Sequence, residues 1–526
     1  MDSWIASIFR LRHLWLLVSL SPLAHGAVVT YPLPSCYKAS DQLTLTANAT
    51  TVPIVATTAV YDTCNFSTDG AVTITITAQE PITSFNISPH SQQIAGTVEG
   101  NRLTFTLEKP SYVIVKINKL REAVIAGDSL ETEAPPASGN RIHNITAIPY
   151  KADASGEQYA TTAIQTAIDT ANKAGGGIVY VPSGVFKCGN VILKSNVSIY
   201  LQGGAVIRGS GLPADYTHDF TKISVGGLNG TWFVSTEPGA KNVKIFGRGT
   251  IDGNGESMRT TYGFLNHAVV PMACSNFTMD GVAVRDAGLW SVIPTRSNHV
   301  TIRNTKVYQE NDRITENDAI DIQECQDVLV DHVLAISQDD AFSTKTWGKG
   351  SKEIGLKYPG DPQELRNVTF NDCIAWTRYA AFKVGNGSTQ NQTDITFQNS
   401  CIYISRDPLK MAPKSGPGTI RNITFENIDV EYYWATAGKN SRWLSLQLET
   451  ACHVENVNIR KIRLLSTGDV DAKIAGFDEG HRLVGVNLQD ISVNGIPASS
   501  LKDLRIPSKT PFVDNLTLTN GSISSR

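Results

Sequence analysis

Strong charge of either sign, long apolar runs and helix-forming segments are all scarce in this chain of 526 residues. Charged residues make up only 18%, and 46 basic residues nearly balance 49 acidic ones. Such a balance gives no electrostatic footprint for nucleic acid or an anionic membrane, so we expect neither partner. The chain is too long for one ordinary compact core, which predicts two domains or one elongated repeat.

The first 26 residues have the pattern of a secretory signal. Arg10, Arg12 and His13 precede the apolar run 14–20, and the small residues of 24–26 suit a cleavage site. The apolar run is too short to span a bilayer, and no later segment has a membrane-spanning run. We therefore expect a secreted, extracellular protein, with an uncleaved N-terminal anchor as the alternative. Thirteen Asn-x-Ser/Thr sequons agree with export and with glycosylation.

Metal-ligand spacings are absent. The eight cysteines form no Cys-x-x-Cys pair and no Cys/His zinc pattern, so no metal and no cofactor is expected. An even number of cysteines in an oxidising compartment indicates structural disulfides. We predict the pairs Cys36–Cys64 and Cys373–Cys401, because each would join neighbouring strand runs. One or two of the cysteines could instead be free and buried.

Residues 27–139 have the pattern of a small antiparallel β-sandwich. Short runs such as 71–77, 102–107 and 112–117 alternate polar and apolar residues, as strands with one buried face do. A Pro/Gly-containing stretch, 135–140, follows as a linker. One helix is predicted over 159–173, where an apolar stripe repeats with helical spacing before three glycines end it.

From residue 196 onward one unit recurs: a polar residue, alternating apolar positions, a short turn and a second β run. Copies start at Asn196, Asn242, Asn276, His299, Asp327, Asn367, Asp394, Asn422, Asn456, Gly485 and Asn515. A loose repeat of this kind, all strand and turn, is typical of a β-solenoid, in which stacked coils share one core. The helix would then cover the open N-terminal end of that core.

Three aspartates flank one β run of this repeat. Asp318 precedes the run 328–336, and the adjacent pair Asp339 and Asp340 follows it. The separation is nearly one coil, and stacked strands lie about 4.8 Å apart, so the three carboxylates should share one patch. Like charges at that distance raise at least one pKa, which suits hydrolysis of a glycosidic bond by an acid and a base. Consecutive aspartates need a bend or bulge to face one way; otherwise they are surface residues.

Several segments resemble known families. Residues 163–184 resemble the entry to the pectate-lyase-like right-handed parallel β-helices. Glu316–Ile322 and Ser337–Ala341 resemble the two aspartate motifs of glycoside hydrolase family 28, Asn-Thr-Asp-Gly-x-Asp and Ser-Gly-Asp-Asp. The preceding β domain is similar to the sandwich of family 49 dextranases and isopullulanases. The resemblance implies an all-β chain, with a β-sandwich at 27–139 and a right-handed parallel β-helix at 140–526.

The resemblance also implies an inverting hydrolase. Asp339 would be the general acid, while Asp318 and Asp340 would hold and deprotonate water. Asp321 would support them, and Lys345 stands where the family usually has a lysine. Further candidate substrate contacts are Trp347, Tyr379, Lys383, Lys410, Tyr433 and Trp434.

Two elements of family 28 are missing. No histidine lies between His332 and His453, and the family's Arg-Ile-Lys position holds Asp407–Met411, in which Lys410 is the basic residue. These losses favour a neutral or differently linked sugar, so pectin-like and dextran- or pullulan-like substrates both stay open. The insertion 348–363 would wall one end of a cleft and favour cleavage at chain ends. A β-helix polysaccharide lyase and a non-catalytic carbohydrate-binding protein are the alternatives, and a monomer is expected.

Overall fold

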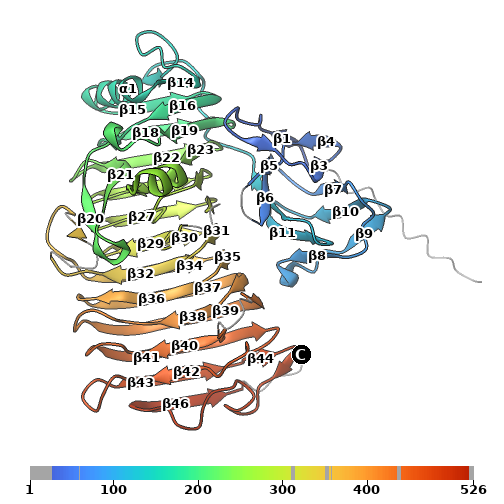
Figure 1. The fold of residues 1–526 in the computed structure, drawn as a ribbon, viewed down its shortest axis with the longest axis vertical. Coiled ribbons are helices and arrows are strands. Elements are labelled where there is room, and N and C mark those ends of the chain that lie inside the picture. The colour runs from blue at the N-terminus through green and yellow to red at the C-terminus, as the bar shows by residue number, and fades with distance from the viewer. Residues whose placement is uncertain are drawn as a thin grey trace, which may run out of the picture.

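The computed structural model describes residues 26–57, 60–309, 314–349, 355–356, 358–434 and 440–520, so the predicted signal segment lies outside the described residues. Nearly all regular structure in these ranges is β-strand. Figure 1 shows a tall parallel solenoid, with α1 (Thr161–Lys173) at one end and a small sandwich beside its middle coils. The predicted fold class is therefore confirmed. No helix in the described ranges is long and apolar enough to cross a bilayer.

The sandwich consists of two packed sheets. The first contains β1 (Val28–Thr30), β2 (Lys38–Ala39), β5 (Val55–Ala56), β6 (Tyr61–Thr68), β8 (Phe85–Ser88), β11 (Tyr112–Ile117) and β12 (Glu122–Ser129). The second contains β3 (Leu43–Ala47), β4 (Thr50–Val52), β7 (Val72–Ala78), β9 (Gly96–Glu99) and β10 (Arg102–Leu107). Alternate residues of β7 are buried, as the period of two in the sequence predicts.

The strands of the solenoid form three faces. The first face is formed by β13 (Ile142–Asn144), β15 (Gly177–Val181), β18 (Val197–Leu201), β22 (Lys241–Gly247), β25 (Ser275–Asp280), β27 (Asn298–Arg303), β30 (Gln326–Asp331), β34 (Leu365–Asn371), β37 (Gln392–Ser405), β39 (Thr419–Tyr433), β41 (His453–Leu464), β43 (Leu483–Gln489) and β46 (Val513–Thr519). Strands β37, β39 and β41 run on into the second face, which also contains β14 (Ser155–Tyr159), β16 (Gly184–Cys188), β19 (Ala205–Gly209), β23 (Thr250–Asp252), β26 (Ala283–Arg285), β28 (Lys306–Tyr308), β31 (Leu334–Ser337), β35 (Ile374–Thr377) and β44 (Ser492–Val493). The short β45 (Ile496–Pro497) pairs with β44.

The third face is formed by β17 (Val191–Leu193), β21 (Leu228–Thr236), β24 (Leu265–Val270), β29 (Ile320–Gln323), β32 (Phe342–Thr346), β36 (Ala380–Ser388), β38 (Asp407–Met411), β40 (Leu444–Gln447) and β42 (Lys473–Ala475). Strand β20 (Phe220–Lys222) folds back antiparallel on β21 and also pairs with β33 (Gly355–Leu356). Short helical turns lie at η1 (His90–Gln92), η2 (Pro213–Asp215), η3 (Ile223–Val225) and η4 (Ser257–Thr261).

The repeat found in the sequence has a backbone cause. All eleven residues that start a copy have a positive φ, between 54° at His299 and 71° at Gly485. Asn, Asp and Gly adopt this left-handed conformation more readily than other residues, and the chain turns there into the first face. The side chains also form an external ladder: Asn276 donates to Asn242 and Asn422 donates to Asp394, each at 2.8 Å. The recurring polar residue therefore marks one corner of every coil.

The sandwich packs against the second face through a buried interface. Tyr61, Tyr112 and Val124 of the sandwich form one apolar cluster with Ile336 and Trp376 of the solenoid. Polar contacts cross the same interface, among them a buried ion pair of 2.7 Å between Lys306 and Asp128. Ser88 also donates to Glu431. The two parts are thus joined by both packing and paired charge.

The predicted disulfides are wrong, because all eight cysteines, each within the described ranges, are free thiols. The Cys401 amide does donate to the Cys373 carbonyl at 2.9 Å, so the two residues lie on neighbouring coils. Cys401, however, pairs with Ile374. This offset of one residue turns the Cys373 thiol into the solenoid core and the Cys401 thiol toward the sandwich. Cys64 faces the sandwich core, while Cys36 lies outside it.

The left-handed corner predicts an order of stability among variants of Asn422, whose φ is 58°. Asn422→Gly removes the ladder hydrogen bonds but tolerates the backbone angle. Asn422→Val removes the same bonds and adds about 1–2 kcal/mol of backbone strain. Scanning calorimetry should therefore give a lower Tm for Asn422→Val than for Asn422→Gly. Equal Tm values would show that the ladder, and not the angle, selects asparagine.

Candidate active site

The three aspartates gather at the corner between the second and third faces. Asp339 and Asp340 lie in the bend between β31 and β32, and Asp318 lies just before β29 on the neighbouring coil. The Ala319 amide donates to the Asp340 carbonyl at 2.9 Å, which places Asp318 level with Asp340. One carboxylate oxygen from each aspartate lies within 4.8 Å of the other two. We call Asp318, Asp339 and Asp340 the acidic cluster.

Two buried lysines hold the acidic cluster from the third face. The Lys345 ammonium lies 2.5 Å from an Asp318 oxygen and 2.6 Å from an Asp321 oxygen. The Lys383 ammonium lies 2.6 Å from Oδ2 of Asp340. Both lysines are only 2% exposed, so these ion pairs act with little screening by solvent. Asp321 also accepts a hydrogen bond from Ser343, which fixes it beneath Lys345.

Burial makes two carboxyl groups of the acidic cluster weaker acids than exposed aspartates are. Burial, together with the neighbouring Asp340 charge, raises the pKa of Asp339 to about 7. Burial also raises the pKa of Asp318 well above its usual range, although the Lys345 ammonium opposes this shift. Asp339 has no ion pair among the described residues, unlike its two neighbours. At mildly acidic pH the site therefore holds a protonated Asp339 carboxyl group beside Asp318 and Asp340, which both contact lysine ammonium groups.

One oxygen of the acidic cluster is available to a small polar ligand. Oδ1 of Asp340 is buried and has no hydrogen-bond partner in the part of the chain that the structure describes. A buried acceptor without a partner is costly, so a bound water or substrate hydroxyl is its natural partner. The spacing of the cluster would also suit a cation. Lys345 and Lys383, however, already place two positive charges at these carboxylates, which disfavours a third.

The acidic cluster belongs to a row of equivalent positions along the third face. Going toward the N-terminus, the same backbone hydrogen-bond pattern places Trp290 level with Asp318 and His267 level with Trp290. Lys345 lies 4.4 Å from the centre of the Trp290 ring. His267 is fully buried, and burial lowers its pKa to about 3, so it is neutral. Aromatic side chains therefore line the row on this side.

This N-terminal side of the row is closed. Phe220 of β20 packs 4.7 Å from the His267 ring, and Tyr358 stacks 5.4 Å from the Trp232 ring. Lys222, from the same hairpin, lies 2.7 Å from Glu316. The hairpin β20–β21 and β33 thus cover the coils that precede the acidic cluster. The rings there are buried, with Trp290 only 4% exposed, except that Trp232 is partly buried.

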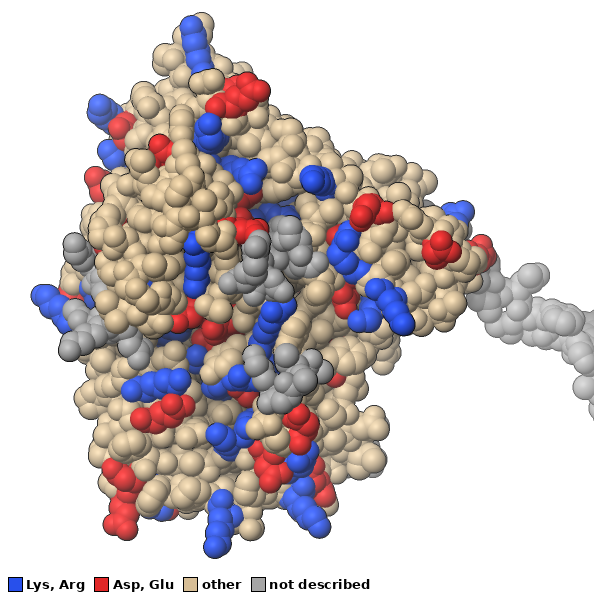
Figure 2. Space-filling view, viewed as in Figure 1, with Lys and Arg blue, Asp and Glu red and all other residues tan. Residues whose placement is uncertain are grey.

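The opposite side of the row is open. Beyond the acidic cluster lies a hollow of about 360 Å³, lined by Tyr379, Arg406, Lys410 and Arg442 around Asp407. Arg406 and Lys410 each pair with Asp407 at 2.8 Å, and both lie 4.1 Å from the centre of the Tyr379 ring. With Lys473 and Glu449, which also line the hollow, four cations thus face two carboxylates. The hollow carries excess positive charge, although acidic and basic side chains are interspersed over the molecular face seen in Figure 2.

The other predicted contacts fall in different environments. Trp434 is half-buried beside the hollow, with the Arg378 guanidinium 4.6 Å from its ring centre. Tyr433 turns the other way, packs against the solenoid core and donates to the Ser466 carbonyl at 2.8 Å. Trp347 is buried, at 4% exposed, in the apolar cluster beneath the closing hairpin. Neither Tyr433 nor Trp347 therefore presents an open ring face to a sugar.

Sequence reasoning missed the residues on the closed side. Trp290, His267 and Lys222 come from coils before the aspartate motifs and follow no motif of their own. It also missed a clamp on the inserted loop, in which Arg296 pairs with Glu324 at 2.6 Å and donates to the carbonyl oxygens of 358–360. Part of the predicted loop 348–363 lies outside the described residues. Trp290 lies one coil before Asp318, so it could have been found from the sequence once the register of the coils was known.

The family model of glycosyl hydrolases family 28 matches residues 178–510, more than half of the chain, and the chain belongs to this family. An exo-poly-alpha-D-galacturonosidase of Dickeya chrysanthemi is 34% identical over 142 residues, covering 26% of this chain and 23% of that protein. The chain thus spans about a quarter of the length of this curated relative.

Two solved structures share the fold. The family 28 exopolygalacturonase of Yersinia enterocolitica matches with a TM-score of 0.53 and 16% identity, covering 86% of this chain and 98% of the other. Dex49A from Penicillium minioluteum matches with a TM-score of 0.61 and 11% identity, covering 92% of this chain and 96% of the other. The second match covers too much of the chain to be confined to the solenoid, so it includes sandwich residues.

The buried lysine predicts a pH-dependent loss of stability. Lys345→Met leaves Asp318 and Asp321 without their cation, and we expect a loss of about 3–5 kcal/mol at neutral pH. Lys345 lowers the pKa of Asp318, so the folded variant holds its proton to higher pH than the wild type does. The unfolded carboxyl group releases that proton earlier, so the free energy of unfolding falls more steeply with rising pH in the variant. Denaturant unfolding of the wild type and the variant at pH 5 and pH 7 measures the free energy of unfolding at each pH. Equal losses at both values would contradict it, and Lys345→Arg is the charge-preserving control.

Proposed function

We propose that this protein is a secreted, glycosylated monomer that hydrolyses galacturonate-containing polysaccharides of the pectin type from their chain ends, with inversion at the anomeric carbon. The observation that carries the proposal is the acidic cluster, in which Asp339 has a pKa of about 7 beside two lysine-paired carboxylates. Secretion rests on the predicted signal at residues 1–26, and glycosylation on the sequons.

The proposed reaction uses the three aspartates in two roles. Asp339 donates its proton to the glycosidic oxygen as the bond from that oxygen to the anomeric carbon breaks. A water held by Oδ1 of Asp340 and by Asp318 attacks the anomeric carbon and gives its proton to one of these carboxylates. The products are two sugar chains, and proton exchange with solvent restores the site. Lys345 and Lys383 orient the water-binding carboxylates and keep their charge tolerable when water is excluded.

The proposal of inversion rests on the ion pairs between the carboxylates and the lysines, and not on the spacing between the carboxylates. Carboxyl groups lie about 6.5–9.5 Å apart in most inverting glycosidases and about 5–5.5 Å apart in retaining ones. Here the nearest oxygens lie within 4.8 Å, which by itself does not favour inversion. Asp318 and Asp340, however, each give an oxygen to an ammonium group at 2.5–2.6 Å, which lowers their power as nucleophiles. The unpartnered oxygen of Asp340 suits water binding instead.

An acidic sugar suits the open side of the row. Arg406, Lys410 and Arg442 surround Asp407, and the whole lining has four cations against two carboxylates, so a uronate carboxylate would offset part of the excess charge. The Arg406 position is one residue away from the Arg-Ile-Lys register, and the fold nevertheless brings it against Tyr379. The relatives named above as acting on polygalacturonate support the same substrate class.

The covered N-terminal side of the row favours cleavage at chain ends. The hairpin β20–β21 and Tyr358 cover the aromatic positions on the N-terminal side of the acidic cluster. A polymer could then extend only along the open side. Lyase chemistry is less well supported, because Lys345 and Lys383 are both tied to carboxylates and neither is a free base.

The decisive experiment compares wild type with Asp339→Asn on polygalacturonate. We expect the variant to lose about 10²- to 10⁴-fold in kcat, because it has no proton to donate. Asp331→Asn, an aspartate on β30 whose carboxylate accepts from Asn371, is the control and should keep full activity. Wild-type kcat should fall as the pH rises through about 7, where Asp339 loses its proton.

Product analysis tests the remaining parts of the proposal. Early release of short sugars with little loss of viscosity supports chain-end attack, and proton NMR should show the inverted anomer first. A fall in viscosity ahead of product release would contradict chain-end attack. Products that absorb as unsaturated uronates would indicate a lyase. Full activity of Asp339→Asn would contradict the assignment of Asp339 as the general acid.

The charge of the hollow predicts selective loss on acidic substrates. Arg406→Gln removes a cation whose charge-assisted hydrogen bond is worth about 1.5–3 kcal/mol, or roughly tenfold to a hundredfold in kcat/KM on an oligogalacturonate. Arg421→Gln, at an exposed arginine of β39, should change nothing. If Arg406→Gln weakens the hydrolysis of neutral glucans equally, the uronate assignment fails.

A further inference from the structure

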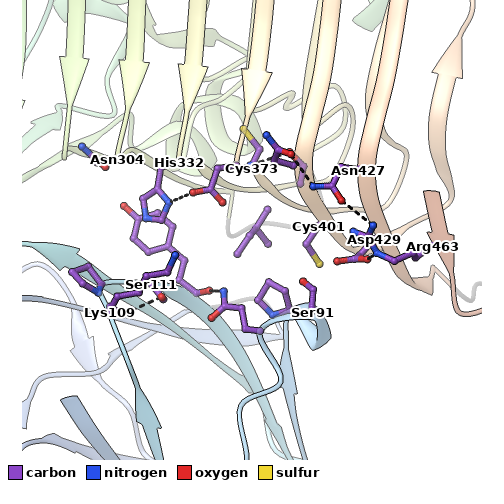
Figure 3. Close-up of a pocket in the computed structure, with 18 of the residues that line it drawn as sticks. Ser91, Lys109, Ser111, Asn304, His332, Cys373, Cys401, Asn427, Asp429 and Arg463 are labelled. Carbon is purple, nitrogen blue, oxygen red and sulfur yellow. Dashed lines mark hydrogen bonds and ion pairs between the residues drawn. The ribbon is translucent and has the colours of Figure 1, made fainter. Parts of the chain in front are cut away.

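A second cavity, of about 520 Å³, lies between the sandwich and the solenoid (Figure 3). Its solenoid wall includes His332, Asp372, Asn399 and Asn427, at the corner between the first and second faces. The facing wall comes from the sandwich and includes Lys109. A cavity of this volume, with polar groups converging from two domains, is of the size that holds small molecules.

The solenoid wall of this cavity is periodic. Asp331 pairs with Asn371, Asn371 with Gln398 and Gln398 with Glu426, so the four residues that follow them, His332, Asp372, Asn399 and Asn427, are level on successive coils. All four have a positive φ of 50–54°, so they form a second corner row. Their spacing is that of stacked strands, about 4.8 Å. A hexose unit of an extended polysaccharide advances by a similar length, so a chain lying along the solenoid axis would meet one polar side chain per sugar.

The cavity is formed before any ligand binds. His332 packs on Tyr112 of the sandwich, with ring centres 4.2 Å apart, and its Nδ1 donates to the Asp372 carboxylate at 2.7 Å. The interface next to it is fixed by the Lys306–Asp128 ion pair and by Glu431, which accepts from the His90 amide. Two walls held at a fixed separation reduce the entropy that binding must lose.

The walls also keep free hydrogen-bonding capacity. The Asp372 side chain is 61% exposed, and its Oδ2 contacts His332 while Oδ1 stays open. Asn427 donates to Asn399 and Asn399 donates to Asn371, each at 2.8 Å, which leaves each amide a second N–H and a second lone pair. Arg463 is tied to Asp429 and Asn427. Lys109, on the facing wall, forms no ion pair among the residues that the structure describes. Among the described residues the Asp372 carboxylate contacts only the His332 ring, so the cavity keeps one ammonium group, on Lys109, and one carboxylate, on Asp372, that a ligand can engage.

We propose that this interdomain cavity is a second carbohydrate site, which binds a short stretch of an acidic polysaccharide without cleaving it. Asp372, Asn399 and Asn427 would bind sugar hydroxyls on successive units, and Lys109 would bind a uronate carboxylate. That the bound sugar is acidic follows from the proposed function, on which this part of the proposal rests. Strand β31 and the sandwich packed on it separate this cavity from the acidic cluster, so the site anchors the polymer and adds avidity.

The test uses the full-length protein with Asp339→Asn, so that the polymer survives the measurement. Affinity electrophoresis in polygalacturonate gels compares this protein with one that also carries Lys109→Ala and Asn399→Gly. Glycine keeps the positive φ of Asn399 and removes its amide. We expect about tenfold weaker retention. The matched control carries Lys119→Ala and Asn422→Gly, an exposed lysine elsewhere on the sandwich and a residue of the other corner row, and should be retained fully.

A second measurement separates this site from the proposed reaction. Lys109→Ala with Asn399→Gly, in the otherwise wild-type protein, should hydrolyse a short oligogalacturonate at the wild-type rate and lose rate only on long polymer. If no polysaccharide is cleaved but retention still depends on Lys109 and Asn399, the proposed function fails and the site stands. Equal retention of the parent and the cavity variant on polygalacturonate, and on a neutral glucan such as dextran, would overturn the site.

Discussion

Register between successive coils is the constraint on which this site depends. Parallel pairing sets each coil against its neighbour with no freedom to slide, because a shift of one residue would turn every core side chain outward. This register places Trp290, Asp318 and Asp340 side by side on successive coils, although they are far apart in sequence. The left-handed corner residues fix the register by starting each coil at the same angle. The geometry of the carboxylates is therefore a property of the stack, and no single loop supplies it.

Burial makes that geometry chemically useful. Two ammonium groups sit among four carboxylates in a water-poor corner, and none of these charges could be buried there alone. The same burial raises the pKa values of Asp339 and Asp318, and Asp339 is the member of the acidic cluster without an ion pair among the described residues. Stability and acid–base function thus draw on the same few contacts, so a substitution made to change one is expected to change the other.

Much of this could be predicted from the sequence, because its signals are local or periodic. Alternation in 71–77 predicts a sandwich strand, and the polar residue that recurs from Asn196 predicts the coils. The offset between Asp318 and Asp339–Asp340 predicts their proximity once coils are assumed. The sequence names Lys345 and Lys383 only as candidate substrate contacts, and the structure shows instead that they pair with the aspartates.

What the sequence did not predict depends on side-chain direction and on contacts between distant segments. Cys373 and Cys401 lie on adjacent coils as expected, but the one-residue offset points their thiols apart. Tyr433 and Trp434 are consecutive, and only the fold shows which one turns inward. The closing hairpin contacts His267 across the stack, and no spacing between Phe220 and His267 signals it. The cavity against the sandwich likewise requires the docking of two domains.

The left-handed corners have a consequence for how such a protein can diversify. Two corners of each coil carry a conformational demand that restricts them to a few residue types, while the third corner, between the second and third faces, is a variable bend. On the third face, the inserted hairpin after β19 and the loop after β32 are accommodated without disturbing the stack. Related proteins can therefore differ in these segments, and so in the length of a substrate groove and in whether one end of it is closed. The geometry of the carboxylates stays the same.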